Sequence, residues 1–367
     1  MCRALRARGI ETCLAATNAD GGQRLDFPVG APVQWQGIPA IFFERDFSES
    51  LKYSHGFATW IARHVSDFDL VHIHGFLSHL CLSAAAAARK AGIPYVIRPL
   101  GTLAPWSLEQ KGLKKRVLLA LGARRELEAA SAIHCTSDEE RRGVEAAFPS
   151  TTCVVIPLGI ESNWFENSPI RKDINDDVRY VLALSRLHPK KNLEALIEAF
   201  MVTASQPWQL VIAGSGDADY TERLERLVRK SGGNRIRLVG WADDTRKRAL
   251  IGAASLFALV SWQENFGISV VEALASGVPA LVSDRVDIAD LVQSRGAGWM
   301  VEPSVEAIAR GLRYALADDA ERGSRARAAR ALAHEFAWPG IADRIGTLYA
   351  GLLRDAQSEL NGSQGSF

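Results

Sequence analysis

The chain has 367 residues and 47% of them are hydrophobic, which is enough material for two domains with a core each. A formal net charge of +1 offers no bulk attraction to nucleic acid. The five cysteines follow neither metal-site nor CxxC spacing, and no apolar run reaches the roughly 18 residues that cross a bilayer. With no signal-peptide pattern either, we expect a cytoplasmic protein with reduced cysteines, no metal site and no nucleic-acid partner.

Apolar runs typical of strands recur along both halves, and helical stretches separate most of them. In the first half we expect strands at 12–18, 39–44, 70–74, 95–100, 132–137 and 153–158, and helices at 78–91 and 107–130. In the second half we expect strands at 180–187, 209–214, 235–240, 255–262, 279–284 and 298–302, and helices at 192–204, 219–231, 245–254, 268–276 and 304–317. This alternation predicts an α/β protein with two Rossmann-like, doubly wound domains that face each other across a cleft.

The predicted boundaries follow from composition and from the proline and glycine positions. We predict an N-terminal domain at 1–160, a polar linker at 161–177 and a C-terminal domain at 178–340. A terminal helix at 341–356, for which we consider a return to the first domain, and a flexible polar tail at 357–367 follow.

The first residues read as the last turns of a helix that Gly9 ends. A doubly wound domain ordinarily begins with a central strand, so we expect a first strand and its turn to precede Met1 in the natural protein.

The stretch 107–125 carries six basic residues interleaved with leucine and valine. A basic amphipathic helix can lie on an anionic membrane surface. A solvated helix face is the other interpretation. The first interpretation predicts peripheral contact with the inner face of an anionic membrane.

Arg186 ends a predicted strand, and Lys191 follows at the start of a helix. In a parallel sheet both would line the cleft, because ligands bind at the carboxyl ends of strands. An arginine fork and a mobile lysine suit a diphosphate. The alternative is a pair of surface cations, but the helix dipole disfavours cations at this position.

Gly214 and Gly216 end the next strand in the words VIAGSGD. Glycines allow a ligand or a neighbouring backbone to approach closely. A tight turn explains them equally well. The full dinucleotide fingerprint is absent, which argues against a nicotinamide enzyme.

The stretch 261–279, SWQENFGISVVEALASGVP, places a short loop between an apolar strand and a helix. The loop ends in Gly267, and the free N–H groups of the helix start favour an anion. Glu264 lies in the loop, and Glu272 lies eight residues later among apolar neighbours. A buried carboxylate needs hydrogen bonds, which sugar hydroxyls would supply. The alternative is a helix whose polar stripe includes a glutamate.

In combination these motifs resemble the family 4 (group 1) retaining glycosyltransferases of the GT-B fold, of the bacterial surface-polysaccharide type. The resemblance covers nearly the whole chain and is strongest in the ENFG and EALASGVP words. It implies that Arg186 and Lys191 hold the diphosphate of a nucleotide-sugar donor beside the AGxG turn of Gly214 and Gly216. It also implies that Glu272 binds the ribose. Donor sugar and phosphates would meet Glu264 and the backbone of Asn265, Phe266 and Gly267.

In the first half the resemblance implies the acceptor side. His74, in the words HIHG, is similar to a histidine that the family places near the donor sugar, although a structural histidine is the alternative. Gly101, in the words RPLGTLAPW, would lie by the acceptor. Two departures stand out: Leu100 replaces a polar or basic residue, and the Gly-rich turn after the first strand is absent.

The expected function is therefore transfer of a sugar from a nucleotide-diphosphate sugar to a glycan or lipid-linked acceptor, with retention and without a metal or other cofactor. As a catalytic pair the resemblance implies Glu264 and His74. Two alternatives stay open: a nucleotide-sugar epimerase, which needs no acceptor, and a non-catalytic nucleotide-binding partner subunit.

Overall fold

The computed structural model describes residues 1–20, 23–47, 51–103, 117–166, 179–203, 207–231 and 235–364. These residues form two compact units. The chain runs through unit 1 from Met1 to Pro157, makes unit 2 from Leu158 to Trp338, and returns to unit 1 from Pro339 to Phe367.

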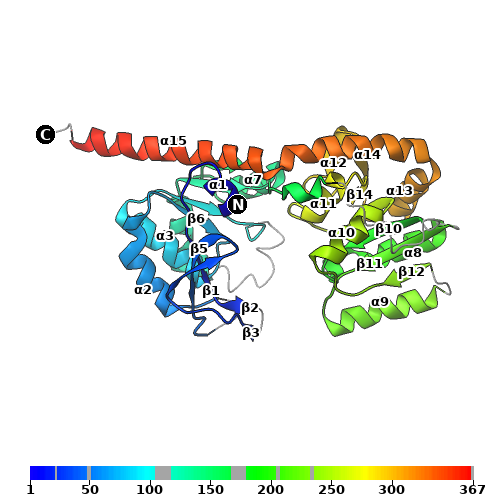
Figure 1. Cartoon of the computed structure of the whole chain (residues 1–367), viewed down its shortest axis with the longest axis horizontal. Coiled ribbons are helices and arrows are strands. Elements are labelled where there is room, and N and C mark those ends of the chain that lie inside the picture. The colour runs from blue at the N-terminus through cyan, green and yellow to red at the C-terminus, as the bar shows by residue number, and fades with distance from the viewer. Residues whose placement is uncertain are drawn as a thin grey trace. The chain divides into compact units, whose positions relative to one another are not determined.

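Unit 1 contains two sheets (Figure 1). The first has the order β1-β5-β4, with β1 (Leu14–Thr17) parallel to β5 (Ile38–Phe43) and β4 (Pro32–Trp35) antiparallel to it. The second is wholly parallel, in the order β6-β7-β8-β9. Its strands are β6 (Val71–His74), β7 (Tyr95–Arg98), β8 (Ala132–Cys135) and β9 (Cys153–Val155). A two-residue ribbon, β2 (Ala19–Asp20) and β3 (Gln23–Arg24), lies apart from both.

The core of unit 1 lies on one face of these strands. Helices α2 (His55–His64) and α3 (His79–Ala91) cover that face, and their side chains pack with Ile41, Ile73 and Ile97 from the strands. Because successive strand residues point to opposite faces, His72 and His74 project from the other face. There His72 meets Tyr349 of the long helix α15 (Trp338–Gln364).

The shorter helices of unit 1 are α1 (Cys2–Arg6), α6 (Arg124–Glu128) and α7 (Asp138–Ala147). A π-helical turn, Leu119–Ala123, leads into α6. The predicted helix 107–130 is therefore only partly described, because residues 104–116 lie outside the described residues. Four cations of the predicted membrane face belong to that range: Lys111, Lys114, Lys115 and Arg116.

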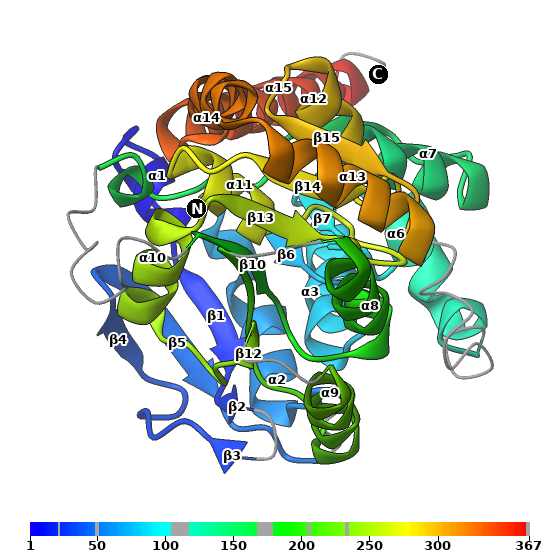
Figure 2. The same cartoon turned by 90° about the vertical axis from the view of Figure 1, so that its right-hand side faces the viewer.

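Unit 2 is one six-stranded parallel sheet in the order β12-β11-β10-β13-β14-β15 (Figure 2). The strands are β10 (Arg179–Leu184), β11 (Trp208–Ala213), β12 (Ile236–Leu238), β13 (Leu256–Leu259), β14 (Ala280–Ser283) and β15 (Gly298–Val301). The chain starts centrally at β10, proceeds to one edge, and then crosses to β13 and the other edge. This reversal next to β10 is the topological switch point where doubly wound sheets bind ligands.

Helices cover both faces of the unit 2 sheet and enclose two apolar cores. One face holds α8 (Leu193–Thr203), α9 (Ala218–Lys230) and α13 (Val305–Ala317). The other face holds α10 (Asp244–Ala253), α11 (Ile268–Ala275), α12 (Ala289–Ser294) and α14 (Asp319–Ala333). The near-continuous apolar strands are buried on both faces, as expected of a covered parallel sheet.

All twelve predicted strands form, and most end a few residues earlier than predicted because the last residues turn into loops. Among the described residues, three strands of unit 1 (β2, β3 and β4) and four helices (α2, α7, α12 and α14) were not predicted.

Two predicted boundary segments are wrong in part. The start of the predicted linker is ordered, because residues Ser162–Trp164 make a 3-10 turn and Trp164 is buried in the unit 2 core. The rest of the linker, 167–177, lies outside the described residues. The predicted tail is helical to Gln364, and α15 begins at Trp338 rather than at 341. Helix-favouring Glu, Leu and Gln residues explain this continuation.

No described helix combines the length and the apolar character that crossing a membrane requires.

Candidate functional site

The connection from β10 to α8 carries three cations within six residues: Arg186, Lys190 and Lys191. It continues the pairing of β10 with β11, because Leu187 N–H donates to the carbonyl of Ser215 (2.8 Å). The turn Pro189–Lys191 follows, and Trp262 N–H donates to the carbonyl of Lys190 (2.9 Å). Arg186 itself is exposed. Backbone contacts from both neighbouring strands therefore hold this cationic loop at the switch point.

Gly214 and Gly216 must be glycines because the backbone of that loop passes too close to them for a side chain. A Cβ at Gly214 would overlap the carbonyl oxygen of Ser185, and a Cβ at Gly216 would overlap that of Leu187. Gly214 also has φ +147°, which side chains rarely adopt. The structure thus shows a close approach of neighbouring backbone at these positions, and a role in donor binding stays a prediction.

Asn192 locks the start of α8. Its side chain is buried and its Nδ2 donates to the carbonyls of Val260 (3.1 Å) and Pro303 (2.8 Å). Its backbone is left-handed, with φ +56°, a conformation that asparagine tolerates better than most residues. The preceding Lys191 is therefore fixed relative to the ends of β13 and β15.

Lys191 and Glu264 form an ion pair between Nζ and Oε2. Both side chains are largely shielded from solvent, at 13% and 22% exposure. Glu264 is held from behind, because its N–H donates to the carbonyl of Arg285 and its own carbonyl accepts from Asp287 N–H (both 3.0 Å). The structure thus brings together two predicted site residues that lie 73 positions apart.

The loop after Glu264 turns into α11 at Gly267, which has φ +77°. A Cβ there would crowd Val286 (3.2 Å) and Leu259 (3.3 Å). Phe266 is buried in the core, edge-on to Phe336, so that only its backbone is left for a ligand. The first intrahelical donor is Val270, and the N–H groups ahead of it have no intrahelical acceptor. This is the helix start that the sequence predicts as an anion site, and Asn265 stands directly before it.

Glu272 lies one turn further along α11, 8% exposed. Its Oε1 accepts from Nζ of Lys247 on α10 at 2.9 Å. Burial raises the pKa of Glu272, and the hydrogen bond and charge of Lys247 oppose that rise. Lys247 also lies over the ring of Trp164, 5.1 Å from its centroid. No spacing in the sequence links Lys247 to Glu272, so this partner was missed.

In unit 1, His74 ends β6 and Arg98 ends β7, directly opposite in the strand register. His74 keeps access to solvent, yet the surrounding protein and then the charge of Arg98 lower its pKa. Gly101 has φ +76°, and its N–H donates to Oε1 of the buried Glu140 at 2.6 Å. His74 and Gly101 therefore lie at the carboxyl edge of the same sheet.

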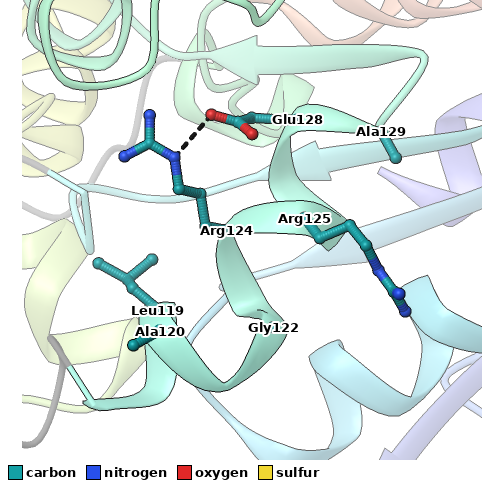
Figure 3. Close-up of a pocket in the computed structure, with 7 residues that line it drawn as sticks. All are labelled: Leu119, Ala120, Gly122, Arg124, Arg125, Glu128 and Ala129. Carbon is teal, nitrogen blue, oxygen red and sulfur yellow. Dashed lines mark hydrogen bonds and ion pairs between the residues drawn. The ribbon is translucent and has the colours of Figure 1, made fainter.

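A pocket of about 560 Å³ lies over α6 and the π-helical turn before it (Figure 3). Its lining includes Arg124 and Glu128, which form an ion pair of 2.8 Å. None of the predicted site residues lines this pocket. Among the residues that the structure describes, no cluster of three histidine, cysteine, aspartate or glutamate side chains could hold a metal.

Two family models match successive parts of the chain. Residues 1–159 match the glycosyl transferase 4-like domain, and residues 165–332 match the glycosyl transferases group 1. The chain belongs to the family 4 glycosyltransferases. This family membership, together with the structural neighbours below, confirms the predicted GT-B fold.

Among curated relatives of this glycosyltransferase is the GDP-mannose:cellobiosyl-diphosphopolyprenol alpha-mannosyltransferase of Komagataeibacter xylinus, 29% identical over 215 residues. The match covers 57% of this chain and 53% of that enzyme, so it spans about half the length of the relative.

Two solved structures share the fold. Sucrose-phosphate synthase of Thermosynechococcus elongatus has a TM-score of 0.78 and 20% identity, over 96% of this chain and 92% of that one. Anabaena HepE in complex with UDP-glucose has a TM-score of 0.73 and 20% identity, over 92% of this chain and 99% of that one.

Proposed function

We propose that this glycosyltransferase moves a hexosyl group from a nucleotide-diphosphate sugar to a glycan or lipid-linked acceptor, with retention, in surface polysaccharide biosynthesis. The observation that carries the proposal is the ion pair of Lys191 with Glu264 at the switch point of unit 2. Beside the start of α11, the lysine of this pair can bind an anion and the glutamate can accept hydrogen bonds from hydroxyls.

The chemistry follows from the charges. Departure of a nucleoside diphosphate builds negative charge on phosphate, and preorganised cations stabilise it. In the proposed cycle Lys191 leaves Glu264 for the donor phosphates, joined by Arg186 and the N–H groups that follow Gly267. Glu264 is then free to accept a hydroxyl of the donor sugar. The phosphate that leaves takes the proton of the acceptor hydroxyl, so that neither a metal nor a covalent enzyme intermediate is required.

Glu272 completes the donor site in this proposal by accepting the ribose hydroxyls. Lys247 stabilises the ionised form of Glu272, and an ionised carboxylate is the stronger acceptor. Phe266 and the rest of the α11 core fix the loop from below. His74 of unit 1 stays a proposed catalytic residue.

We propose GDP-mannose as the first donor to test, because the Komagataeibacter relative is named for that donor and for a diphosphopolyprenol-linked acceptor. The named complex of the Anabaena protein makes UDP-glucose the second donor. For a lipid-linked acceptor, the basic stretch 107–125 would contact the inner face of an anionic membrane.

The test uses purified full-length chain, each donor, and a membrane extract that contains lipid-linked oligosaccharides, with and without EDTA. We expect transfer to be lost in Lys191→Ala and Glu264→Ala and retained in Lys230→Ala, a control in the last turn of α9. The anomeric configuration of the product, measured by NMR, reports retention.

Full activity of both site variants would overturn the site. Conversion of the donor without an acceptor would favour the epimerase alternative. Nucleoside-diphosphate binding without transfer to any acceptor would favour the non-catalytic alternative.

A further inference from the structure

Arg98 is a buried arginine for which the described part of the chain supplies no side-chain partner. Its residue is 4% exposed, and its Nε is wholly buried without a hydrogen bond. Among the residues that the structure describes, no carboxylate lies within ion-pair distance of its guanidinium. A buried charge ordinarily has an ion pair and hydrogen bonds, because leaving water is costly. The other buried charged residues in the described part of the chain, Glu126, Glu140, Glu272 and Arg322, all use their charged groups in hydrogen bonds.

Glu140 is the carboxylate whose charge acts on Arg98, but both of its oxygens already accept hydrogen bonds from other groups. Glu140 raises the pKa of Arg98 but does not reach it, and burial still lowers that pKa to about 10. Both oxygens of Glu140 accept hydrogen bonds elsewhere: Oε1 from Gly101 N–H, and Oε2 from the N–H and the hydroxyl of Thr136. Glu140 therefore holds the loop after β7 in place and leaves the guanidinium unpaired.

Besides Glu140 and the phenol of Tyr349, the groups around Arg98 include three imidazoles. His74 is opposite it in the register of β6 and β7, and His72 and His134 contact each other on the same face (3.3 Å). His134 Nε2 donates to the carbonyl of Ile156, and His72 Nδ1 shares a hydrogen bond with the hydroxyl of Tyr349, so both rings are fixed. Burial and the charge of Arg98 lower the pKa of each ring, which keeps them neutral. The face thus carries one fixed positive charge among neutral hydrogen-bonding rings.

This arrangement is open at one point. His74 is an exposed residue while the adjacent Arg98 is buried, so this face of the sheet reaches the surface at His74, next to Arg98. An oxyanion that arrives past His74 would gain a bidentate guanidinium partner and an imidazole donor. The donor diphosphate already has its own cations in unit 2.

We propose that Arg98, with His74, binds a phosphoryl group of the acceptor in unit 1. The assignment to the acceptor rests on the proposed function, whereas the anion site itself rests on Arg98 alone. A lipid-linked acceptor carries such a group beside its sugar. Arg98 then acts as a substrate-binding and specificity-determining residue, and it leaves the chemical step to the donor unit.

The first test measures thermal unfolding of the full chain without ligand. Arg98→Met removes an unpaired buried charge, so we expect the midpoint to rise by about 2–4 °C. The matched control is Arg322→Met, because Arg322 is equally buried but donates to the carbonyl of Ala315 (2.8 Å) and pairs with Asp319. That variant should have a lower midpoint. A lower midpoint in Arg98→Met as well would show a structural arginine and overturn the proposal.

The second test titrates pyrophosphate and a nucleoside diphosphate into the same proteins by calorimetry. Arg98→Met should weaken one pyrophosphate site by about tenfold to a hundredfold and leave nucleoside-diphosphate binding unchanged. Lys191→Ala should do the reverse. Arg98→Lys, which keeps the charge but not the fork, should retain part of the affinity. If Lys191→Ala alone removes all pyrophosphate binding, unit 1 has no phosphoryl site and the proposal is wrong. If Lys191→Ala instead leaves nucleoside-diphosphate binding unchanged, the proposed donor site in unit 2 is wrong.

The source of the phosphoryl group is separated by two further titrants. Geranyl diphosphate should bind in an Arg98-dependent manner and more tightly than inorganic phosphate if the site takes a lipid-linked diphosphate. Equal affinities identify a site for a phosphate group alone. Glucuronate binding that depends on Arg98, with no phosphate binding, would contradict the phosphoryl assignment.

Discussion

Nζ of Lys247 lies 2.9 Å from Oε1 of Glu272, and the two residues come from neighbouring helices, α10 and α11. This pair gives the buried glutamate a protein partner that does not depend on a ligand. The proposed ribose site and the stability of unit 2 therefore depend on the same carboxylate, so both should respond to pH and to the loss of Lys247.

Replacement of Lys247 by methionine should reduce the free energy of unfolding by roughly 1–3 kcal/mol at neutral pH, because a buried acceptor loses its charged donor. Urea denaturation measures this. Lys230→Met, at an exposed helix end, is the control and should change little. An unchanged stability of Lys247→Met would show that Glu272 is neutral or solvated.

Glu272→Gln should change the pH dependence of stability. A raised pKa means that the folded state binds this proton more tightly than the unfolded state, so the contribution of Glu272 to stability falls as pH rises through its folded-state pKa, above the ordinary value of 4.5. Glutamine has no proton to lose. The unfolding free energy of Glu272→Gln should thus rise more steeply, or fall less, than that of the wild type as pH increases above 4.5.

The histidines of unit 1 predict the opposite pH effect. Burial and Arg98 lower the pKa of His134 to about 4, against an ordinary value of 6.5. The unfolded chain then binds more protons than the folded one between these values, so unit 1 should lose stability as pH falls from about 6.5 to 4. Hydrogen exchange of β6 and β8 amides measures the loss separately from unit 2. His134→Gln should flatten the dependence, and an unaltered slope would contradict it.

Lys191 and Glu264 should respond differently to a nucleoside diphosphate that lacks a sugar. Lys191→Met should weaken its binding by about tenfold to a hundredfold, the worth of one charge-assisted contact. Glu264→Gln should bind it at least as tightly as the wild type, because Lys191 no longer has a competing partner, while sugar transfer is lost. Weakened nucleotide binding in both variants would contradict the exchange of partners.

Gly214→Ala and Gly216→Ala should each lower the free energy of unfolding by roughly 1–3 kcal/mol or more, because a Cβ would overlap a carbonyl oxygen and the loop that carries Arg186 must move. Nucleotide affinity should fall with stability. Gly252→Ala is the control: Gly252 lies in α10 with open space around it, so alanine should stabilise the helix by up to about 1 kcal/mol. Thermal unfolding and calorimetry together measure both effects.

Local signals in the sequence were sufficient for the twelve predicted strands and for α11, but not for β2, β3 and β4. Apolar runs and helix-ending glycines can be recognised from a few consecutive residues. Gly277, for example, ends α11 with the left-handed backbone that was expected of it (φ +74°). Strand ends were placed too late because Arg186 and similar residues follow the strand as loop. Helix α2 had a signal that was overlooked, since Ser54 caps it by accepting from Phe57 N–H (3.2 Å).

The partners of the site residues could not be predicted. Lys247 meets Glu272, and Asn192 meets Val260 and Pro303, only because parallel strands far apart in sequence end at one edge. The polar composition around Trp164 indicated a linker, but one buried indole fixes that segment to unit 2. Likewise, nothing in the letters RPLG separates a partnered arginine from the unpaired Arg98.

The chain enters and leaves unit 2 through two adjacent backbone segments. Ile160 N–H donates to the carbonyl of Phe336 (2.8 Å), and Trp338 N–H donates to that of Ile160 (3.2 Å). Gly159 leaves room for the indole of Trp338, which a Cβ would overlap. Residues 158–338 are thus a cassette whose two ends are fastened together. Recombination that exchanged this cassette between relatives would replace the whole of unit 2, and with it the proposed donor site, in one event, while unit 1 would keep its own sheets and helix α15.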